Sequence, residues 1–167
     1  MAGGVSVVEV IRPVALNGPD NDGEALLQLL DSYARDPMGG GKPLPEQVQQ
    51  NLIPQLKTRN DYLGVIAFQN NQPVGLINAF EGLSTFAARP LLNIHDVIVA
   101  REFRGNGLAQ RMMSELEQLA RQRGCCKLTL EVLSNNSAAQ KAYRKFGFAA
   151  YELDPEAGQA LFWQKPI

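Results

Sequence analysis

The segment from residue 91 to residue 133 constrains the fold of this chain more than any other. It contains an apolar strand, LLNIHDVIV (91–99), a glycine-rich turn, an amphipathic helix ending near Gly124, and a second apolar strand, KLTLEVL (127–133). A strand, a helix and a strand in this order form a crossover unit, because parallel neighbours need a long connection. The two strands are therefore predicted to be parallel and adjacent in a mixed α/β sheet.

Antiparallel strands are predicted before this unit and at the end of the chain. VSVVEVIR (5–12) reads as a first strand, and a short polar turn, NNQ, joins two β-rich runs into a hairpin. A second hairpin closes the chain. With the crossover unit these runs predict a sheet of six or seven strands. The hairpin runs are YLGVIAFQ (62–69), PVGLINAFEG (73–82), FAAYELD (148–154) and AGQALFWQK (157–165).

Further helices are predicted from apolar positions at helical spacing, and they would cover both faces of the sheet. One spans Gly23 to Arg35, a second begins at Pro45 and is kinked or shortened by Pro54, and a third ends at Gly147. Residues 36–45, DPMGGGKPLP, contain three glycines and three prolines, so they are predicted to be a loop with neither helix nor strand.

Composition favours one domain, residues 1–167, in the cytoplasm. Sixteen basic and seventeen acidic residues give a net charge of −1, so no overall field attracts nucleic acid or an anionic membrane. No run approaches the roughly 20 apolar residues of a membrane span, and MAGGVSVVEV does not resemble a targeting leader. The adjacent Cys125 and Cys126 lack the spacing of metal ligands and are interpreted as buried structural thiols.

The turn REFRGNGLAQRMM (101–113) has two possible explanations. Small residues at a helix start allow an anion to reach unpaired N–H groups, and Arg104 could add a cation. Alternatively, Gly105 and Gly107 only serve a tight turn with positive φ. A Walker A loop is excluded because Leu108 and Ala109 follow Gly107, and Gln110 and the single crossover unit disfavour a Rossmann site.

Two motifs resemble the GCN5-related N-acetyltransferase (GNAT) family. The family signature of Gln or Arg, two residues, Gly, one residue, and Gly or Ala matches the turn that follows strand 91–99. A second segment, N-x-x-A-x-x-x-Y-x-x-x-G-F, matches downstream in the same register, so the resemblance is strong over about 91–151. The matching residues are Arg104, Gly107 and Ala109, and then Asn136, Ala139, Tyr143, Gly147 and Phe148.

The resemblance implies an acyl-CoA N-acyltransferase fold in which strand 91–99 splays from its parallel neighbour. Acetyl-CoA would be the acetyl donor, without a metal. Its pyrophosphate would lie on the N–H groups of residues 104–109, and pantetheine would pair with Val97–Val99, where a free N–H near Val97 or Ile98 would face the thioester oxygen. The cofactor residues implied are Val97, Ile98, Val99, Arg104, Gly105, Asn106, Gly107, Leu108, Ala109, Asn136 and Tyr143.

The resemblance also implies catalytic side chains. Tyr143 would act as general acid for the leaving thiolate, and Asn136 would bond pantetheine or cap its helix. A base is needed because a protonated amine has no lone pair. His95, Asp96 or a water chain could serve, although both side chains could instead be structural, and strand alternation predicts them on opposite faces.

The predicted function is transfer of acetyl from acetyl-CoA to a primary amine of a small molecule, by direct attack in a ternary complex. A protein or peptide amine as acceptor, or a non-catalytic acyl-CoA sensor, are the alternatives. Residues 83–99 resemble the diamine acetyltransferase branch more weakly, because His95 replaces a Glu of that branch. The resemblance makes a homodimer possible, and the oligomeric state, the acceptor and the acyl-chain selectivity are left open.

Overall fold

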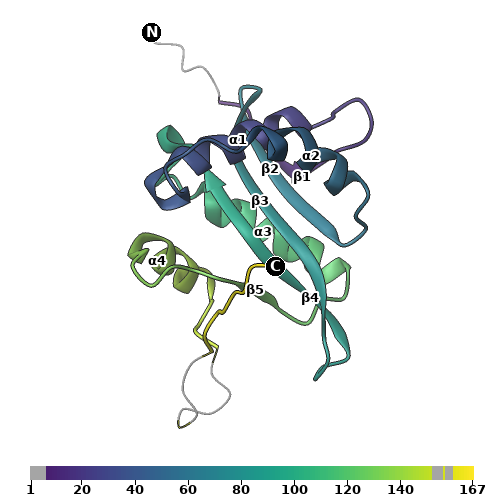
Figure 1. Ribbon diagram of the computed structural model, residues 1–167, viewed down its shortest axis with the longest axis vertical. Helices are drawn as coiled ribbons and strands as arrows, with labels where there is room; N and C mark the ends of the chain where they lie inside the picture. Colours follow the sequence, from purple (N-terminus) through teal and green to yellow (C-terminus); the bar gives the residue numbers. More distant parts are fainter. Residues whose placement is uncertain (1–6, 152–155, 157–159) are drawn as a thin grey trace. The chain divides into compact units, whose positions relative to one another are not determined.

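The computed structural model describes residues 7–151, 156 and 160–167. They belong to two compact units, Met1–Leu130 and Glu131–Ile167, and each unit is described by itself. The first unit contains a five-stranded sheet with the strand order β1-β2-β3-β4-β5 (Figure 1). A mixed α/β fold is thus confirmed, but the described residues hold five strands instead of the six or seven predicted.

The strands from β1 to β4 each run antiparallel to the next, and β5 lies parallel to β4. The parallel pair confirms the crossover unit predicted for 91–133, although β5 is shorter than predicted. A two-residue turn joins β2 to β3, since Asn70 and Asn71 have φ values of 49° and 65°, as a type I′ turn requires. The strands are β1 (Glu9–Pro13), β2 (Tyr62–Gln69), β3 (Gln72–Ser84), β4 (Arg89–Val99) and β5 (Leu128–Leu130).

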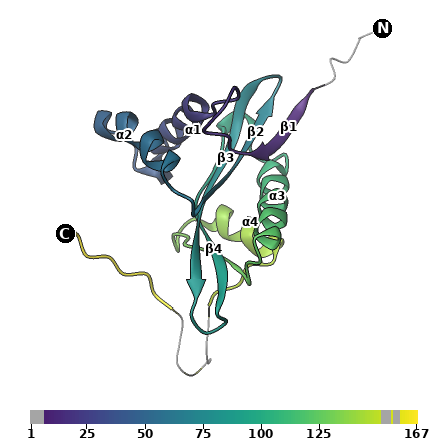
Figure 2. The same cartoon turned by 90° about the vertical axis from the view of Figure 1, so that its right-hand side faces the viewer.

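Helices cover both faces of the sheet, as predicted (Figure 2). The α1 helix (Gly23–Arg35) spans the predicted residues and buries Leu26 and Leu29 against one face. The α3 helix (Leu108–Gln122) lies on the other face. The sulfur atom of its Met112 is 2.7 Å from the position that a Cβ on Gly75 of β3 would take. Glycine on β3 therefore allows α3 to approach the sheet closely.

The segment between α1 and β2 differs in detail from its prediction. Residues 36–45 are not purely loop, because Pro37–Gly39 form a single 3₁₀ turn, η1. The α2 helix (Glu46–Lys57) starts one residue after Pro45, and Pro54 lies inside it without ending it. A second 3₁₀ turn, η2 (Arg101–Phe103), follows β4.

The second unit contains the α4 helix (Ser137–Phe146). The predicted closing hairpin lies partly outside the described residues, at 152–155 and 157–159. Its described flanks are not strands, and a hydrogen bond of 3.3 Å runs from the Ala160 N–H to the Tyr151 carbonyl. In the first unit, residues 5 and 6 of the predicted first strand are also outside the described part, and β1 begins only at Glu9.

Cys125 and Cys126 are half-buried, which corrects the prediction that they are buried. Burial nevertheless raises the pKa of the Cys125 thiol, and the charge of Glu81 adds to this rise. No helix in the described parts of the chain has the length and apolar character needed to cross a membrane.

Candidate functional site

The glycine-rich turn leads from β4 into α3. Gly105 and Gly107 have φ values of 83° and 73°, so both positions need the left-handed conformation that glycine adopts without strain. Gly107 is the N-cap of α3 and, as a glycine, has no side chain that could accept a hydrogen bond from the first turn of the helix. The turn has the predicted positive φ values, which both explanations allow, so the anion-binding role stays a prediction.

The side chain of Arg104 is already engaged by protein groups. Its Nε donates to the Val99 carbonyl over 3.0 Å, and its Nη2 donates to the Asp36 carboxylate over 3.1 Å. Asp36 also accepts a hydrogen bond from the Met38 N–H. Both bonds lower the pKa of Asp36, the bond from Met38 more than the bond from Arg104. A phosphate that uses Arg104 must therefore share or replace the Asp36 carboxylate.

Arg111 is a second cation at this turn, and the sequence reasoning missed it. Its Nη1 donates to the Asn106 carbonyl over 2.8 Å, while Nε and Nη2 donate to the two Glu9 carboxylate oxygens, each over 2.8 Å. Its spacing of four residues from Gly107 was the available signal, because such residues share one helix face. Arg111 thus ties the turn to the edge strand β1.

The parallel pairing between β4 and β5 covers only three residues of β4, Leu92–Ile94. Val97–Val99 pair with Gly75–Ile77 of β3 on one side, beyond the end of β5 at Leu130. The predicted splay of the parallel pair agrees with this early end of pairing. Pairing of pantetheine with these residues is untested and stays a prediction.

A β-bulge at His95 changes the direction of the β4 side chains. Asp96 pairs with Asn78 and Ile94 pairs with Ala79, so His95 is an extra residue on β4. The His95 ring packs edge-on against Phe80, with 4.9 Å between centroids, and Asp96 bonds to Asn78. Asn78 and Phe80 are two residues apart, hence on one face of β3. The prediction that His95 and Asp96 lie on opposite faces is therefore wrong.

A chain of polar side chains leads to Asp96 across three strands. The Tyr62 hydroxyl donates to Asn78 Oδ1, and Asn78 Nδ2 donates to Asp96 Oδ2, each over 2.9 Å. Asn78 is only 5% exposed, and burial raises the pKa of Tyr62 well above its usual value, so its hydroxyl remains protonated. Sequence reasoning did not identify Tyr62 or Asn78.

Tyr33 brings the end of α1 to the same face of the sheet. Burial raises the pKa of Tyr33, the charges of Asp96 and Asp36 raise it further, and Arg104 opposes them. Its hydroxyl is therefore within electrostatic reach of the bulge, of η1 and of the glycine turn. The first unit gathers two carboxylates, one guanidinium and one phenol around the end of β4.

Two predicted site residues belong to the second unit. The Asn136 side chain accepts the Ala139 N–H over 3.1 Å and caps α4, which confirms the capping role. Tyr143 is half-buried on α4, and its ring packs edge-on against Phe148 with 6.0 Å between centroids. The roles of both residues toward pantetheine and thiolate are untested by this arrangement.

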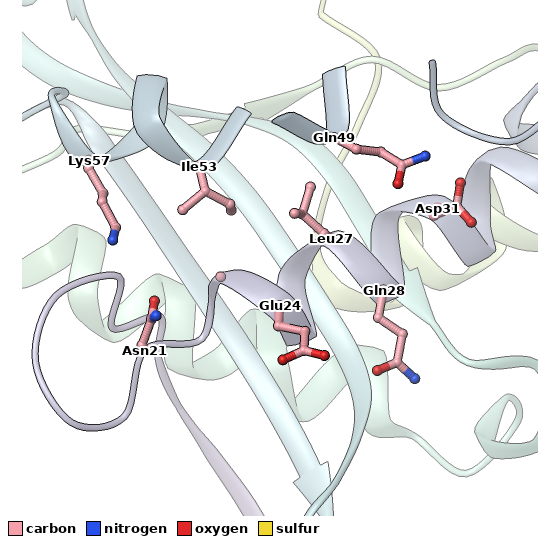
Figure 3. A pocket seen from close by; sticks show the side chains of 9 residues that line it. Asn21, Glu24, Leu27, Gln28, Asp31, Gln49, Ile53 and Lys57 are labelled. Carbon is pink, nitrogen blue, oxygen red and sulfur yellow. The ribbon is translucent and has the colours of Figure 1, made fainter. Parts of the chain in front are cut away.

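A separate groove of about 490 Å³ lies between α1 and α2 (Figure 3). Leu27 and Ile53 form its apolar floor, and Glu24 and Asp31 add carboxylates from α1. None of the predicted site residues lines this groove. Among the described residues, no three His, Cys, Asp or Glu side chains are arranged to hold a metal ion.

Comparison with known proteins finds the acetyltransferase (GNAT) family model over residues 24–148. Streptothricin acetyltransferase of Streptomyces lavendulae is 39% identical over 80 residues, which are 48% of this chain and 42% of that enzyme, so the match spans less than half of the relative. A solved aminoglycoside acetyltransferase from an uncultured soil metagenomic sample superimposes with a TM-score of 0.77 at 18% identity, covering 95% and 96% of the two chains. An aminoglycoside N-acetyltransferase in complex with CoA superimposes with a TM-score of 0.74 at 16% identity, covering 99% of each.

Proposed function

Because the chain belongs to the GNAT family of acetyltransferases, we propose that it transfers an acetyl group from acetyl-CoA to a primary amine of a small molecule. One observation carries the proposal: a turn with two left-handed glycines opens α3 directly after a strand whose parallel pairing stops early. The relative named for streptothricin supports a small-molecule acceptor.

The proposed donor site lies at the turn and along the end of β4. The N–H groups of Gly105–Ala109 would hold the pyrophosphate, because unpaired donors and the helix dipole both favour an anion there. Only the backbone of Leu108 can take part, since its side chain is 2% exposed and packs in the core. Backbone groups of Val97–Val99 on the side away from β3 would pair with pantetheine.

The proposed chemistry is a direct attack within a ternary complex. Acetyl-CoA supplies the acetyl group as a thioester. The amine nitrogen bonds to the carbonyl carbon, the carbon–sulfur bond breaks, and Tyr143 gives its proton to the leaving sulfur. An N–H near Val97 or Ile98 stabilises the carbonyl oxygen, and His95 or Asp96 accepts the amine proton directly or through water.

A panel of amines with acetyl-CoA, read out as free thiol, tests the proposal. The panel contains streptothricin, sisomicin, glucosamine 6-phosphate and a lysine-containing peptide. We expect thiol release with at least one small amine and a matching acetylated product by mass spectrometry. Turnover of the peptide alone would favour a protein acceptor, and tight acetyl-CoA binding without turnover would favour a sensor.

The proposed enzyme is cytoplasmic and forms a homodimer. Light scattering of the purified protein tests the second part, because a homodimer doubles the 18.3 kDa mass of the chain. A mass of one chain at assay concentration would remove the dimer from the proposal.

A further inference from the structure

Tyr62, Asn78 and Asp96 form a hydrogen-bonded chain across β2, β3 and β4. Each of its two bonds is 2.9 Å long, and the three residues are 16 and 18 positions apart in the sequence. The chain ends at the bulge beside His95, on the face of the sheet covered by α1. A buried amide thus connects a phenol to a carboxylate inside the proposed acetyltransferase site.

The direction of this chain is determined by which groups can donate. Asn78 Oδ1 has no proton, so the Tyr62 hydroxyl must be the donor to it. The amide NH2 of Asn78 then faces Asp96 and donates to its carboxylate. With the amide turned over, Oδ1 would face a carboxylate oxygen, and two acceptors would repel each other. The carboxylate therefore determines the orientation of the amide, the phenol stabilises that orientation by donating to Oδ1, and the amide holds one oxygen of Asp96.

Gly64 makes room for the phenol. It is the register partner of Asn78 on β2, and a Cβ at this position would collide with the Tyr62 hydroxyl and with the Val14 side chain. Gly64 does not have a positive φ, so backbone conformation does not require glycine here. The space above Gly64 is occupied by the hydroxyl that reaches Asn78.

The two candidate bases at the bulge differ in how they are held. The second carboxylate oxygen of Asp96 has no hydrogen-bond partner in the described part of the chain, and the residue is half-buried. His95 is exposed, and its contact within the described residues is the Phe80 ring. Asp96 is oriented with one oxygen available, whereas the imidazole has no hydrogen bond to set its orientation.

We propose that Tyr62 and Asn78 are positioning residues that aim the Asp96 carboxylate at the incoming amine. The available oxygen of Asp96 accepts a hydrogen bond from the ammonium form of the acceptor and then takes its proton. The amine nitrogen is thereby left with the lone pair that attacks the thioester carbon. This inference rests on the proposed acetyltransferase function and selects Asp96 over His95.

The test measures steady-state kinetics for sisomicin and streptothricin at saturating acetyl-CoA. Asn78→Ala removes the hydrogen bond to the carboxylate, and Tyr62→Phe removes the bond that stabilises the amide, so each is expected to lower kcat/KM for the amine by about tenfold. The Kd for acetyl-CoA stays unchanged. Asn93→Ala is the matched control, because Asn93 also donates across strands, to Thr129 over 2.9 Å, but does not contact Asp96.

A double-mutant cycle separates positioning from a general structural effect. In an Asp96→Asn background, Tyr62→Phe should cause no further loss of kcat/KM, because the residue that it positions is already disabled. Additive losses, or equal losses in Asn93→Ala, would overturn the inference while leaving the acetyltransferase activity in place.

A third result would also overturn the inference. If His95→Ala abolished turnover and Tyr62→Phe did not change it, His95 would be the group that accepts the amine proton. If the wild-type protein turned over neither amine nor any other member of the amine panel, the proposed function would fail and this inference would fail with it.

Discussion

Two charged side chains near the C-terminal end of β4 are held in different ways: Arg104, in the turn that follows the strand, and Asp96, at the bulge. At the end of the strand, Arg104 is about half exposed, with 48% of its side chain accessible, and it pairs with the Asp36 carboxylate. At the bulge, Asp96 is held by the neutral amide of Asn78, which is 5% exposed. An exposed ion pair is weak and can exchange partners, whereas a buried amide holds a carboxylate in one orientation.

This difference suits the two proposed substrates. A CoA pyrophosphate is an anion that can compete with Asp36 for Arg104, so an exchangeable pair is useful at the glycine turn. An acceptor amine has to meet a base in a defined geometry, so a fixed carboxylate is useful at the bulge.

Asn78→Asp should have the largest effect, because it disrupts the buried hydrogen bond between Asn78 and Asp96. It places a second carboxylate next to Asp96 and replaces the donating amide, so two like charges oppose each other in a buried position. We expect the free energy of unfolding to fall by about 3 kcal/mol. Urea unfolding at pH 7 measures this loss, which should shrink in acid as a carboxylate takes up a proton. A loss no larger than that of Asn78→Ala would contradict the account.

Tyr143→Phe tests whether the chemistry depends on the second unit. Without its phenolic proton the leaving thiolate is not protonated, and we expect turnover at saturating amine to fall by roughly 100-fold. The Kd for acetyl-CoA should stay nearly the same, since the ring and its contact with Phe148 remain. Unchanged turnover would remove Tyr143 from the mechanism.

Asp36→Asn weakens the exposed ion pair between Asp36 and Arg104 and should improve a property of the protein, the affinity for acetyl-CoA. Arg104 then loses a competing carboxylate, so acetyl-CoA should bind about twofold to fivefold tighter, in line with the energy of an exposed ion pair. Asp31→Asn is the matched control, because Asp31 pairs with Arg35 on α1. Titration calorimetry distinguishes the two variants. Weaker binding in Asp36→Asn alone would show that the ion pair supports the cofactor site.

Glu9→Gln should have the smallest effect, because the Arg111–Glu9 pair is largely exposed. The hydrogen bond from Arg111 lowers the pKa of Glu9, so the pair stabilises the fold above the ordinary carboxyl pKa and loses this contribution as the pH falls through the lowered value. We expect a loss of about 0.5 kcal/mol at pH 7 and none near pH 2. Thermal unfolding at both pH values checks this, and a loss independent of pH would argue against the ion pair.

Features made by residues close in sequence could be predicted. The spacing of Gly105 and Gly107 predicts a tight turn, and Asn136 predicts a helix cap; both are confirmed because such structures depend on a few neighbouring residues. The α1 helix has the predicted bounds because its apolar positions and its ends agree. The family was predictable for the same reason, since its motifs are short segments.

Side-chain contacts made across paired strands could not be predicted. Tyr62, Asn78 and Asp96 meet only in the folded sheet, and no local pattern marks them as partners. The bulge inserts one residue, His95, without a glycine or proline to indicate it, so the alternation argument placed Asp96 and His95 on opposite faces. Arg104 is recognisable in the sequence as a cation of the turn, but its pairing with Asp36 is not, because the two residues are 68 positions apart in the sequence.

The central claim is that the pyrophosphate of acetyl-CoA binds at the N-terminal turn of α3, and two glycine variants test it most directly. Gly107 and Gly124 have φ values of 73° and 74° at opposite ends of α3, so Gly107→Glu and Gly124→Glu introduce similar backbone strain and the same charge, although a Cβ at Gly107 also lies 3.3 Å from Arg111 Nη1. Titration calorimetry with CoA should show binding at least about tenfold weaker in Gly107→Glu, because only there does the carboxylate face the pyrophosphate. Gly124→Glu should bind CoA like the wild-type protein. Equal affinity in both variants would contradict the claim.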